Sequence, residues 1–197
     1  MQALTLLTLL LTADPLAVYA VPGADTGVAW GNGTNASVSY YLPLIRELNR
    51  NGVSVVAATT GQAWSGEEIA LAGEALEALG CTRIIAMGHS QGAGGALRAA
   101  RDRPDLFVAV CPIMPGADIY SDCPCFLVTA ERDLQAVKQA AAKLDAWYPG
   151  PLLHGERKGI NHYQTGDREL CRRVAQFAAT GDATLSTRYW RVLRWEE

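Results

Sequence analysis

The sequence has 197 residues, of which 49% are hydrophobic and 19% are charged, and its formal net charge is -3. A chain of this length and composition can bury the core of one ordinary globular domain. Because the charge is small and lysine and arginine form no cluster, the composition argues against nucleic acid and anionic membranes as partners.

The chain begins with an apolar stretch. Residues 1–12 contain six leucines and no charged residue, which resembles the apolar region of a secretory signal without its basic start. The stretch is too short to span a bilayer, so we expect no stable membrane insertion. We expect residues 1–13 to be a signal-like segment of a secreted or periplasmic protein and residues 14–197 to be a single domain. The alternative is a buried first helix or strand in a cytoplasmic protein.

Strand and helix patterns alternate along the rest of the chain. Short apolar runs bounded by turn residues predict strands at 16–21, 27–30, 53–58, 84–87, 106–110, 126–129 and 152–154. Helical spacing predicts helices at 39–51, after a Ser-x-x-Glu capping box at 65–68, from residue 95, at 134–147 and at 169–177. This alternation predicts an α/β protein with a doubly wound, mostly parallel sheet of about seven strands and helices on both faces.

The central strand ends in the pentapeptide Gly88-His89-Ser90-Gln91-Gly92. A Gly-x-Ser-x-Gly sequence between an apolar strand and a small-residue helix is the context of a nucleophile elbow, where a strained turn exposes the serine. Side chains at Gly88 and Gly92 would clash with the neighbouring strand or helix. We therefore expect Ser90 to be a nucleophile, the alternative being a structural Ser-Gly turn.

A serine nucleophile needs a histidine as base and a carboxylate that orients it. The chain has three histidines. His89 precedes the nucleophile and should point away from it as a packing residue, and His154 lies in an apolar strand-like run. His162 lies in a polar loop after the last predicted strand and is the expected base.

The expected acid is Asp133, in the loop that follows the strand at 126–129. Glu131 on the same loop is the second candidate. Asp118 and Asp122 are weaker candidates because they lie before that strand. With Asp133 as the acid and His162 as the base, the order along the chain is Ser, Asp, His, as in hydrolases of this motif.

One further feature is the loop after the second predicted strand. Residues 30–35 form a Gly- and Asn-rich loop between a strand and a helix, the place that supplies a second oxyanion N–H in this fold class, although a plain turn is the alternative. Its two Asn-x-Ser/Thr glycosylation patterns are treated as accidental.

The five cysteines show no zinc-ligand spacing, so we expect no metal. Cys81 and Cys111 are expected in the core, and Cys123, Cys125 and Cys171 as thiols or bridge partners.

Four separated motifs together resemble the cutinase-like polyester hydrolases of the α/β-hydrolase superfamily, over residues 16–193: the pentapeptide at 88–92, the loop ending in Gly33-Thr34, and residues 129–133 and 159–163. The resemblance implies an α/β-hydrolase fold without a lid domain, cleavage of carboxylic esters, and no cofactor. By position it implies an oxyanion hole formed by the backbone N–H groups of Thr34 and Gln91. The expected substrate-binding residues are Gly33, Trp64, Gly116 and Tyr163.

The residues expected to hold substrate differ from that family's pattern. Thr34 stands where the family has an aromatic residue, Gln91 where it has methionine, and Gly116 where it has a tryptophan that clamps the substrate. We therefore expect a small, soluble or aliphatic ester as substrate rather than an aromatic polyester, with Trp64 able to replace the lost ring.

The leading hypothesis is a monomeric serine esterase that acts on a small-molecule or polymeric ester through an acyl-enzyme. A dienelactone-hydrolase-like enzyme or an acyltransferase with the same residues is the alternative among enzymes. A non-catalytic binding protein on this scaffold is the alternative from another class.

Overall fold

The computed structural model describes residues 16–59, 65–181 and 188–195. The signal-like segment at 1–13 and Trp64 lie outside these ranges. The strands are β1 Leu16–Tyr19, β2 Thr26–Gly31, β3 Val53–Ala58, β4 Arg83–His89, β5 Ala109–Ile113, β6 Cys125–Arg132, β7 Leu152–Asn161 and β8 Trp190–Trp195. The helices are the 3₁₀ turn η1 Val38–Tyr41 and the α-helices α1 Leu42–Arg50, α2 Glu67–Ala78, α3 Gln91–Asp102, α4 Gln135–Trp147 and α5 Arg168–Thr180.

The described strands form one sheet in the order β1-β3-β2-β4-β5-β6-β7-β8. Neighbouring strands from β3 to β7 are parallel, whereas β1 and β8 at the two edges are antiparallel to β3 and β7. The predicted doubly wound, mostly parallel sheet is therefore confirmed, with eight strands. Successive helices cross over between parallel strands, and the described residues include no separate lid domain.

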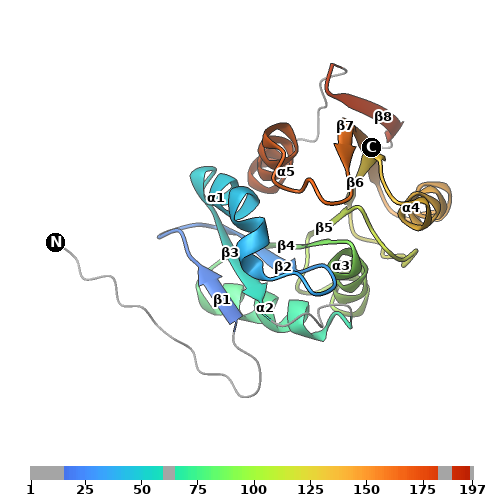
Figure 1. The fold of residues 1–197 in the computed structure, drawn as a ribbon. Coiled ribbons are helices and arrows are strands. Elements are labelled where there is room, and N and C mark those ends of the chain that lie inside the picture. The colour runs from blue at the N-terminus through green and yellow to red at the C-terminus, as the bar shows by residue number, and fades with distance from the viewer. Residues whose placement is uncertain (1–15, 60–64, 182–187, 196–197) are drawn as a thin grey trace.

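Helices cover both faces of the sheet (Figure 1). Buried side chains of α1 and α5, such as Leu44 and Val174, form one core with one face of the strands. Buried side chains of α2, α3 and α4, such as Ile69, Leu97 and Leu144, form a second core with the other face. Strands β3 and β4 are buried on both sides, which explains their continuous apolar runs.

Two predicted strands have different bounds in the structure, and one further strand was not predicted. Strand β5 covers Ala109–Ile113 instead of 106–110, because Leu106 and Phe107 are buried in the turn after α3, where the Leu106 N–H bonds to the Arg103 carbonyl. Strand β7 extends to Asn161 rather than ending at residue 154, and β8 was not predicted. The added strand buries Trp190 against the ring of Phe126, with the centroids 6.3 Å apart.

The predicted capping box at residues 65–68 is wrong. Gly66 is the N-cap residue of α2 and has a φ of 89°, and the hydroxyl of Ser65 accepts a hydrogen bond from the Glu67 N–H at 3.3 Å. A Cβ on Gly66 would lie 2.9 Å from the backbone nitrogen of Ala99 in α3. Close packing between the start of α2 and α3, which local sequence does not reveal, therefore sets this helix terminus.

Candidate active site

The pentapeptide forms a strained strand-to-helix turn at the carboxyl end of β4. Ser90 is the N-cap residue of α3, with φ 55° and ψ -113°, a conformation that a non-glycine residue rarely adopts. A Cβ on Gly88 would lie 2.3 Å from the carbonyl oxygen of Gly92, and a Cβ on Gly92 would lie 2.3 Å from that of Gly31. Only glycine at both positions lets α3 approach β4 and β2 this closely.

Neighbouring strands hold the turn through backbone hydrogen bonds. The Ser90 N–H donates to the Ile113 carbonyl at 3.0 Å, and the Gly116 N–H donates to the Ser90 carbonyl at 3.1 Å. Met114, between these partners, also has a positive φ of 50°. The backbone around Ser90 is thus fixed from β5 and from the loop after it.

The structure brings Ser90, His162 and Asp133 together in one hydrogen-bonded row. Nε2 of His162 lies 3.0 Å from Oγ of Ser90, and Nδ1 of His162 lies 2.8 Å from Oδ1 of Asp133. A carboxylate oxygen only accepts, so Nδ1 of His162 donates and Nε2 is left to accept the hydroxyl proton of Ser90. The Leu134 N–H also donates to Oδ1 at 2.8 Å, and the Asp133 side chain is fully buried.

The other candidate acids have different partners. Oε2 of Glu131 accepts a hydrogen bond from the Gly159 N–H at 2.8 Å, and Oε1 of Glu131 lies 3.7 Å from the Arg191 guanidinium. Asp118 pairs with Lys143 at 3.1 Å, and Asp122 is exposed in the segment before β6.

His154 is likewise engaged elsewhere. Its Nε2 lies 3.0 Å from Oγ1 of Thr129, and its Nδ1 lies 3.1 Å from Oδ1 of Asp145. Of the three histidines, only His162 contacts the serine hydroxyl.

Thr34 and Gln91 face each other across the site. Oγ1 of Thr34 donates a hydrogen bond of 2.6 Å to Oε1 of Gln91, the first residue of α3. Behind Thr34, the buried Asn32 side chain accepts from the Trp30 indole N–H at 2.9 Å and donates to the Ala58 carbonyl at 2.6 Å. Asn32 therefore bonds the loop after β2 to β2 itself and to the end of β3, and Thr34 bonds the loop to the first residue of α3.

The predicted substrate-binding residues lie around Ser90 to different degrees. A Cβ on Gly33 would lie 3.4 Å from Cβ of Ser90, and one on Gly116 would lie 3.7 Å from the Ser90 carbonyl carbon. Tyr163 is 67% exposed, and its ring meets that of His162 edge to face with centroids 5.3 Å apart. Trp64 lies outside the described residues.

A buried polar cluster behind the site was not predicted. The hydroxyl of Tyr41 lies 2.9 Å from the Gly33 nitrogen and 3.0 Å from Nδ1 of His89, and Nε2 of His89 lies 2.9 Å from the His162 carbonyl oxygen. His89 is therefore hydrogen-bonded as well as packed. Burial and the neighbouring His162 lower the pKa of His89 to about 4, and burial raises the pKa of Tyr41 to about 12. No sequence pattern marks Tyr41 as a partner of a residue 48 positions away.

The thiols are poorly suited to act as nucleophiles. All five cysteines are free and buried, so the bridges left open above do not form. Burial raises the pKa of Cys171 to about 12 and raises the pKa values of Cys81, Cys111 and Cys125 as well. These four are therefore protonated at neutral pH, and a thiol nucleophile needs the thiolate.

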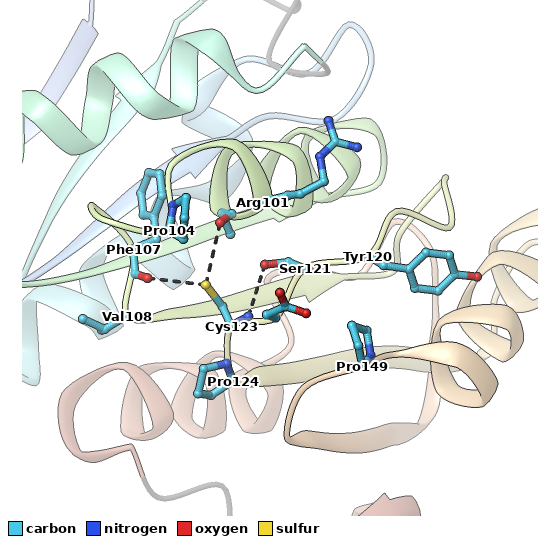
Figure 2. Close-up of a pocket in the computed structure, with 11 residues that line it drawn as sticks. Arg101, Pro104, Phe107, Val108, Tyr120, Ser121, Cys123, Pro124 and Pro149 are labelled. Atoms are coloured by element: carbon cyan, nitrogen blue, oxygen red, sulfur yellow. Dashed lines mark hydrogen bonds between the residues drawn. The ribbon is translucent and has the colours of Figure 1, made fainter.

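A separate hollow of about 450 Å³ opens where β5 and β6 begin, at the ends of these strands opposite to the ends near Ser90. Figure 2 shows the residues that line it. It lies at the far end of α3, beside Arg101, and before β5 and β6, beside Val108 and Pro124. The Cys123 thiol at its wall is within hydrogen-bonding distance of the Ala100 and Phe107 carbonyls, at 3.7 and 3.4 Å. Of the residues considered for the site, only the weaker acid candidate Asp122 lines this hollow.

Two other classes of site are absent from the described parts of the chain. Within residues 16–59, 65–181 and 188–195, no three side chains of the metal-binding types cluster closely enough to hold an ion. Among the helices of these same ranges, none has the length and apolarity needed to cross a bilayer.

No protein-family model matches the sequence, and no curated protein matches it. Its structure is similar to that of a monoacylglycerol lipase from Paleococcus ferrophilus, with a TM-score of 0.71 and 16% identity over 86% of this chain and 100% of the lipase. It is also similar to a predicted CIB-like hydrolase from Thermoplasma acidophilum, with a TM-score of 0.62 and 15% identity over 83% of this chain and 90% of the other. Est1E from Butyrivibrio proteoclasticus gives a TM-score of 0.61 and 15% identity over 84% and 90% of the two chains. At such low identity these likenesses establish the fold, which is the α/β-hydrolase fold.

Proposed function

We propose that this protein is a serine hydrolase that cleaves carboxylic esters, with Ser90 as nucleophile, His162 as general base and Asp133 as the residue that orients His162. The observation that carries the proposal is the row of hydrogen bonds from Asp133 through His162 to Ser90, at 2.8 and 3.0 Å. It occurs at the carboxyl edge of the sheet, where α/β folds place their ligands. Two structural neighbours named as a lipase and a hydrolase support the same class of reaction.

The chemistry divides into two acyl transfers. Oγ of Ser90 attacks the ester carbonyl carbon while Nε2 of His162 takes the hydroxyl proton, and the histidine then gives that proton to the departing alcohol. Water next attacks the acyl-enzyme with His162 again as base, which releases the carboxylic acid and returns the proton to Ser90. Backbone N–H groups of Thr34 and Gln91 stabilise the oxyanion of each tetrahedral intermediate.

The substrate we propose is a small, soluble or aliphatic ester, and a cutinase-like preference for polymeric ester is the extension of this proposal. The residues beside Ser90 favour the smaller substrate. Gly116 provides no ring, and Thr34 and Gln91 bond to each other instead of presenting an apolar surface. Within the described ranges, Tyr163 is an exposed aromatic side chain that packs against His162.

Hydrolysis of p-nitrophenyl esters of increasing acyl length tests the proposal. We expect turnover on the short esters, together with covalent labelling of Ser90 by a fluorophosphonate. Replacing Ser90 or His162 by alanine should each lower turnover by roughly 10⁴–10⁶-fold, and the double variant should be scarcely worse, because the two residues act as a unit. Ser37→Ala, an exposed serine bonded to Ser39, is the matched control and should leave turnover unchanged.

The same assay separates the alternatives. Turnover that rises when an acceptor alcohol is added would favour an acyltransferase, and preference for a lactone would favour a dienelactone-hydrolase-like enzyme. Failure of both labelling and hydrolysis in folded protein would leave a binding protein on this scaffold.

A further inference from the structure

Tyr41 and His89 connect the two loops on which the proposed chemistry depends. The Tyr41 hydroxyl contacts the backbone of Gly33, next to Thr34, and the His89 ring contacts the backbone of His162. The hydroxyl and the ring also contact each other at 3.0 Å. Tyr41 is 1% exposed and His89 4%, so water does not compete for these bonds.

The chemistry of the partners fixes the direction of every bond. The His162 carbonyl can only accept, so Nε2 of His89 carries a proton. Because burial keeps the pKa of His89 at about 4, the ring is neutral at pH 7 and its Nδ1 is an acceptor. The Tyr41 hydroxyl, protonated because its pKa is about 12, therefore donates to Nδ1, and its oxygen accepts from the Gly33 N–H.

The oxyanion loop is the loop after β2 that carries Gly33 and Thr34, and the base loop is the loop after β7 that carries His162 and Tyr163. We propose that Tyr41 and His89 are positioning residues that fix these two loops relative to Ser90. They do so through one directed chain of hydrogen bonds from the Gly33 N–H to the His162 carbonyl. This inference rests on the proposed function, because it assigns a task within that site. Neither residue touches Ser90 Oγ or takes part in proton transfer.

The surrounding contacts support this role. Tyr40, the neighbour of Tyr41 in η1, donates a hydrogen bond to the Tyr163 carbonyl, so η1 holds the base loop at a second point. The ring of His89 also packs against that of His162, with centroids 4.7 Å apart. His162 is thus held at its backbone and at its ring, while its two nitrogens remain bonded to Ser90 and Asp133.

Substitutions at His89 distinguish its hydrogen bond to the His162 carbonyl from its hydrogen bond to the Tyr41 hydroxyl. A glutamine amide reaches about as far as Nε2 and can keep the donor to the His162 carbonyl, whereas an asparagine amide reaches only to the position of Nδ1. We expect His89→Gln, which keeps the donor to the His162 carbonyl and loses the acceptor for Tyr41, to retain more of kcat on p-nitrophenyl acetate than His89→Asn. His89→Asn should lower kcat by roughly 10–100-fold with little change in KM, since a displacement of about 1 Å in catalytic geometry costs on that order.

Tyr41→Phe should also lower kcat. The double variant Tyr41→Phe/His89→Asn should be scarcely worse than the worse single variant, because both substitutions break the same chain of hydrogen bonds.

Matched controls lie elsewhere in the fold. His154 is a buried histidine with two hydrogen bonds, and Tyr148 is a buried tyrosine that donates to the Cys123 carbonyl at 2.7 Å. His154→Asn and Tyr148→Phe should lower Tm and leave kcat unchanged. Equal kcat for His89→Gln and His89→Asn, or equal losses in the controls, would overturn the proposal.

Proton and ¹⁵N NMR of histidine give a readout that needs no turnover. We expect a neutral Nε2–H tautomer for His89 at pH 7, and a downfield Nδ1–H proton for His162 that survives in His89→Gln and broadens or shifts in His89→Asn. An Nδ1–H tautomer, or a His162 proton indifferent to both substitutions, would overturn the chain of hydrogen bonds. If the native protein labels and hydrolyses nothing, the proposed function fails, while the NMR result still decides whether His89 orients His162.

Discussion

The hydroxyl of Thr34 donates a hydrogen bond of 2.6 Å to the side-chain carbonyl of Gln91, which lies 57 residues further along the chain. The bond joins the loop after β2 to the first turn of α3, the two segments proposed to supply the oxyanion N–H groups. We therefore infer that these exposed side chains fix the separation between the two backbone donors.

Removing that bond tests the inference. Thr34→Val keeps the size of the side chain and the backbone N–H but removes the hydroxyl. It should lower kcat by less than the roughly 10²–10³-fold that loss of a whole oxyanion donor costs. Gln91→Leu should have a similar effect, and the double variant should not add the two losses. Additive losses measured on p-nitrophenyl acetate would contradict the coupling.

Asp133 and Glu131 give a second prediction. Asp133 contacts Nδ1 of His162, whereas Glu131 binds the Gly159 N–H and faces Arg191. Asp133→Asn should lower kcat by up to about 10⁴-fold, because an asparagine amide can no longer hold His162 in the tautomer that accepts the serine proton. Glu131→Gln, measured in parallel, should stay within a few-fold of the native enzyme. A larger loss in the Glu131 variant would move the acid to Glu131.

Gly92 and Gly94 lie two residues apart in α3 and predict opposite changes in stability. A Cβ on Gly92 would lie 2.3 Å from the Gly31 carbonyl oxygen, whereas one on Gly94 would meet its nearest neighbour, Cβ of Ala117, at 3.4 Å. Gly92→Ala should cost at least about 3 kcal/mol of unfolding free energy, because backbone cannot move aside. Gly94→Ala should gain about 0.5–1 kcal/mol, as expected of alanine in a helix. Urea denaturation of the two variants measures both, and equal stabilities would show that the close approach at Gly92 relaxes.

The sequence predicted most of the fold because its central elements obey local rules. The buried parallel strands β3 and β4 are continuous apolar runs, and the strained turn at Ser90 carries the glycines that its geometry requires. Ser90, Asp133 and His162 could be selected because each follows a recognisable strand in the order that the motif requires.

Elements set by distant contacts were not predicted correctly. The apolar residues Leu106 and Phe107 belong to a turn buried under helices, and the strand itself contains Pro112, which argues against a central strand. Strand β8 mixes arginines with apolar residues as an edge strand does. The hydrogen bonds of Tyr41 depend on positions brought together by η1 and the end of β4, so no local periodicity could reveal them.

The buried histidine behind the site predicts how stability depends on pH. The pKa of His89 falls from 6.5 to about 4 in the folded state, chiefly because of burial, and burial also lowers the pKa of His154. Between pH 6.5 and 4 the unfolded chain therefore binds protons that the folded protein does not, so stability falls as the pH falls through this window. His89 alone should account for a loss of about 3 kcal/mol. The groups that face it are His162, Asp133 and Tyr41.

Urea titrations at pH 7 and pH 4.5 measure this effect. His89→Asn carries no titrating ring, so its unfolding free energy should change less between the two pH values than that of the native protein. An unchanged pH dependence in His89→Asn would assign the acid sensitivity to other groups.

Gly116 carries the prediction on substrate range. It lies beside Ser90, at the position where the proposed cutinase-like extension would require a tryptophan, and a Cβ there would meet only ordinary contacts of 3.7 Å or more. Gly116→Trp should therefore fold and supply the missing ring. An aromatic pair contributes about 0.5–1.5 kcal/mol beyond its buried area, so release of soluble products from aromatic polyester film should rise roughly 2- to 10-fold. Hydrolysis of p-nitrophenyl acetate, which the ring hardly contacts, should change less, and Gly116→Ala controls for the added Cβ. Equal gains on film and on the short ester would contradict the clamp, and strong film hydrolysis by the native protein that disappears in Trp64→Ala would place the ring at Trp64 instead.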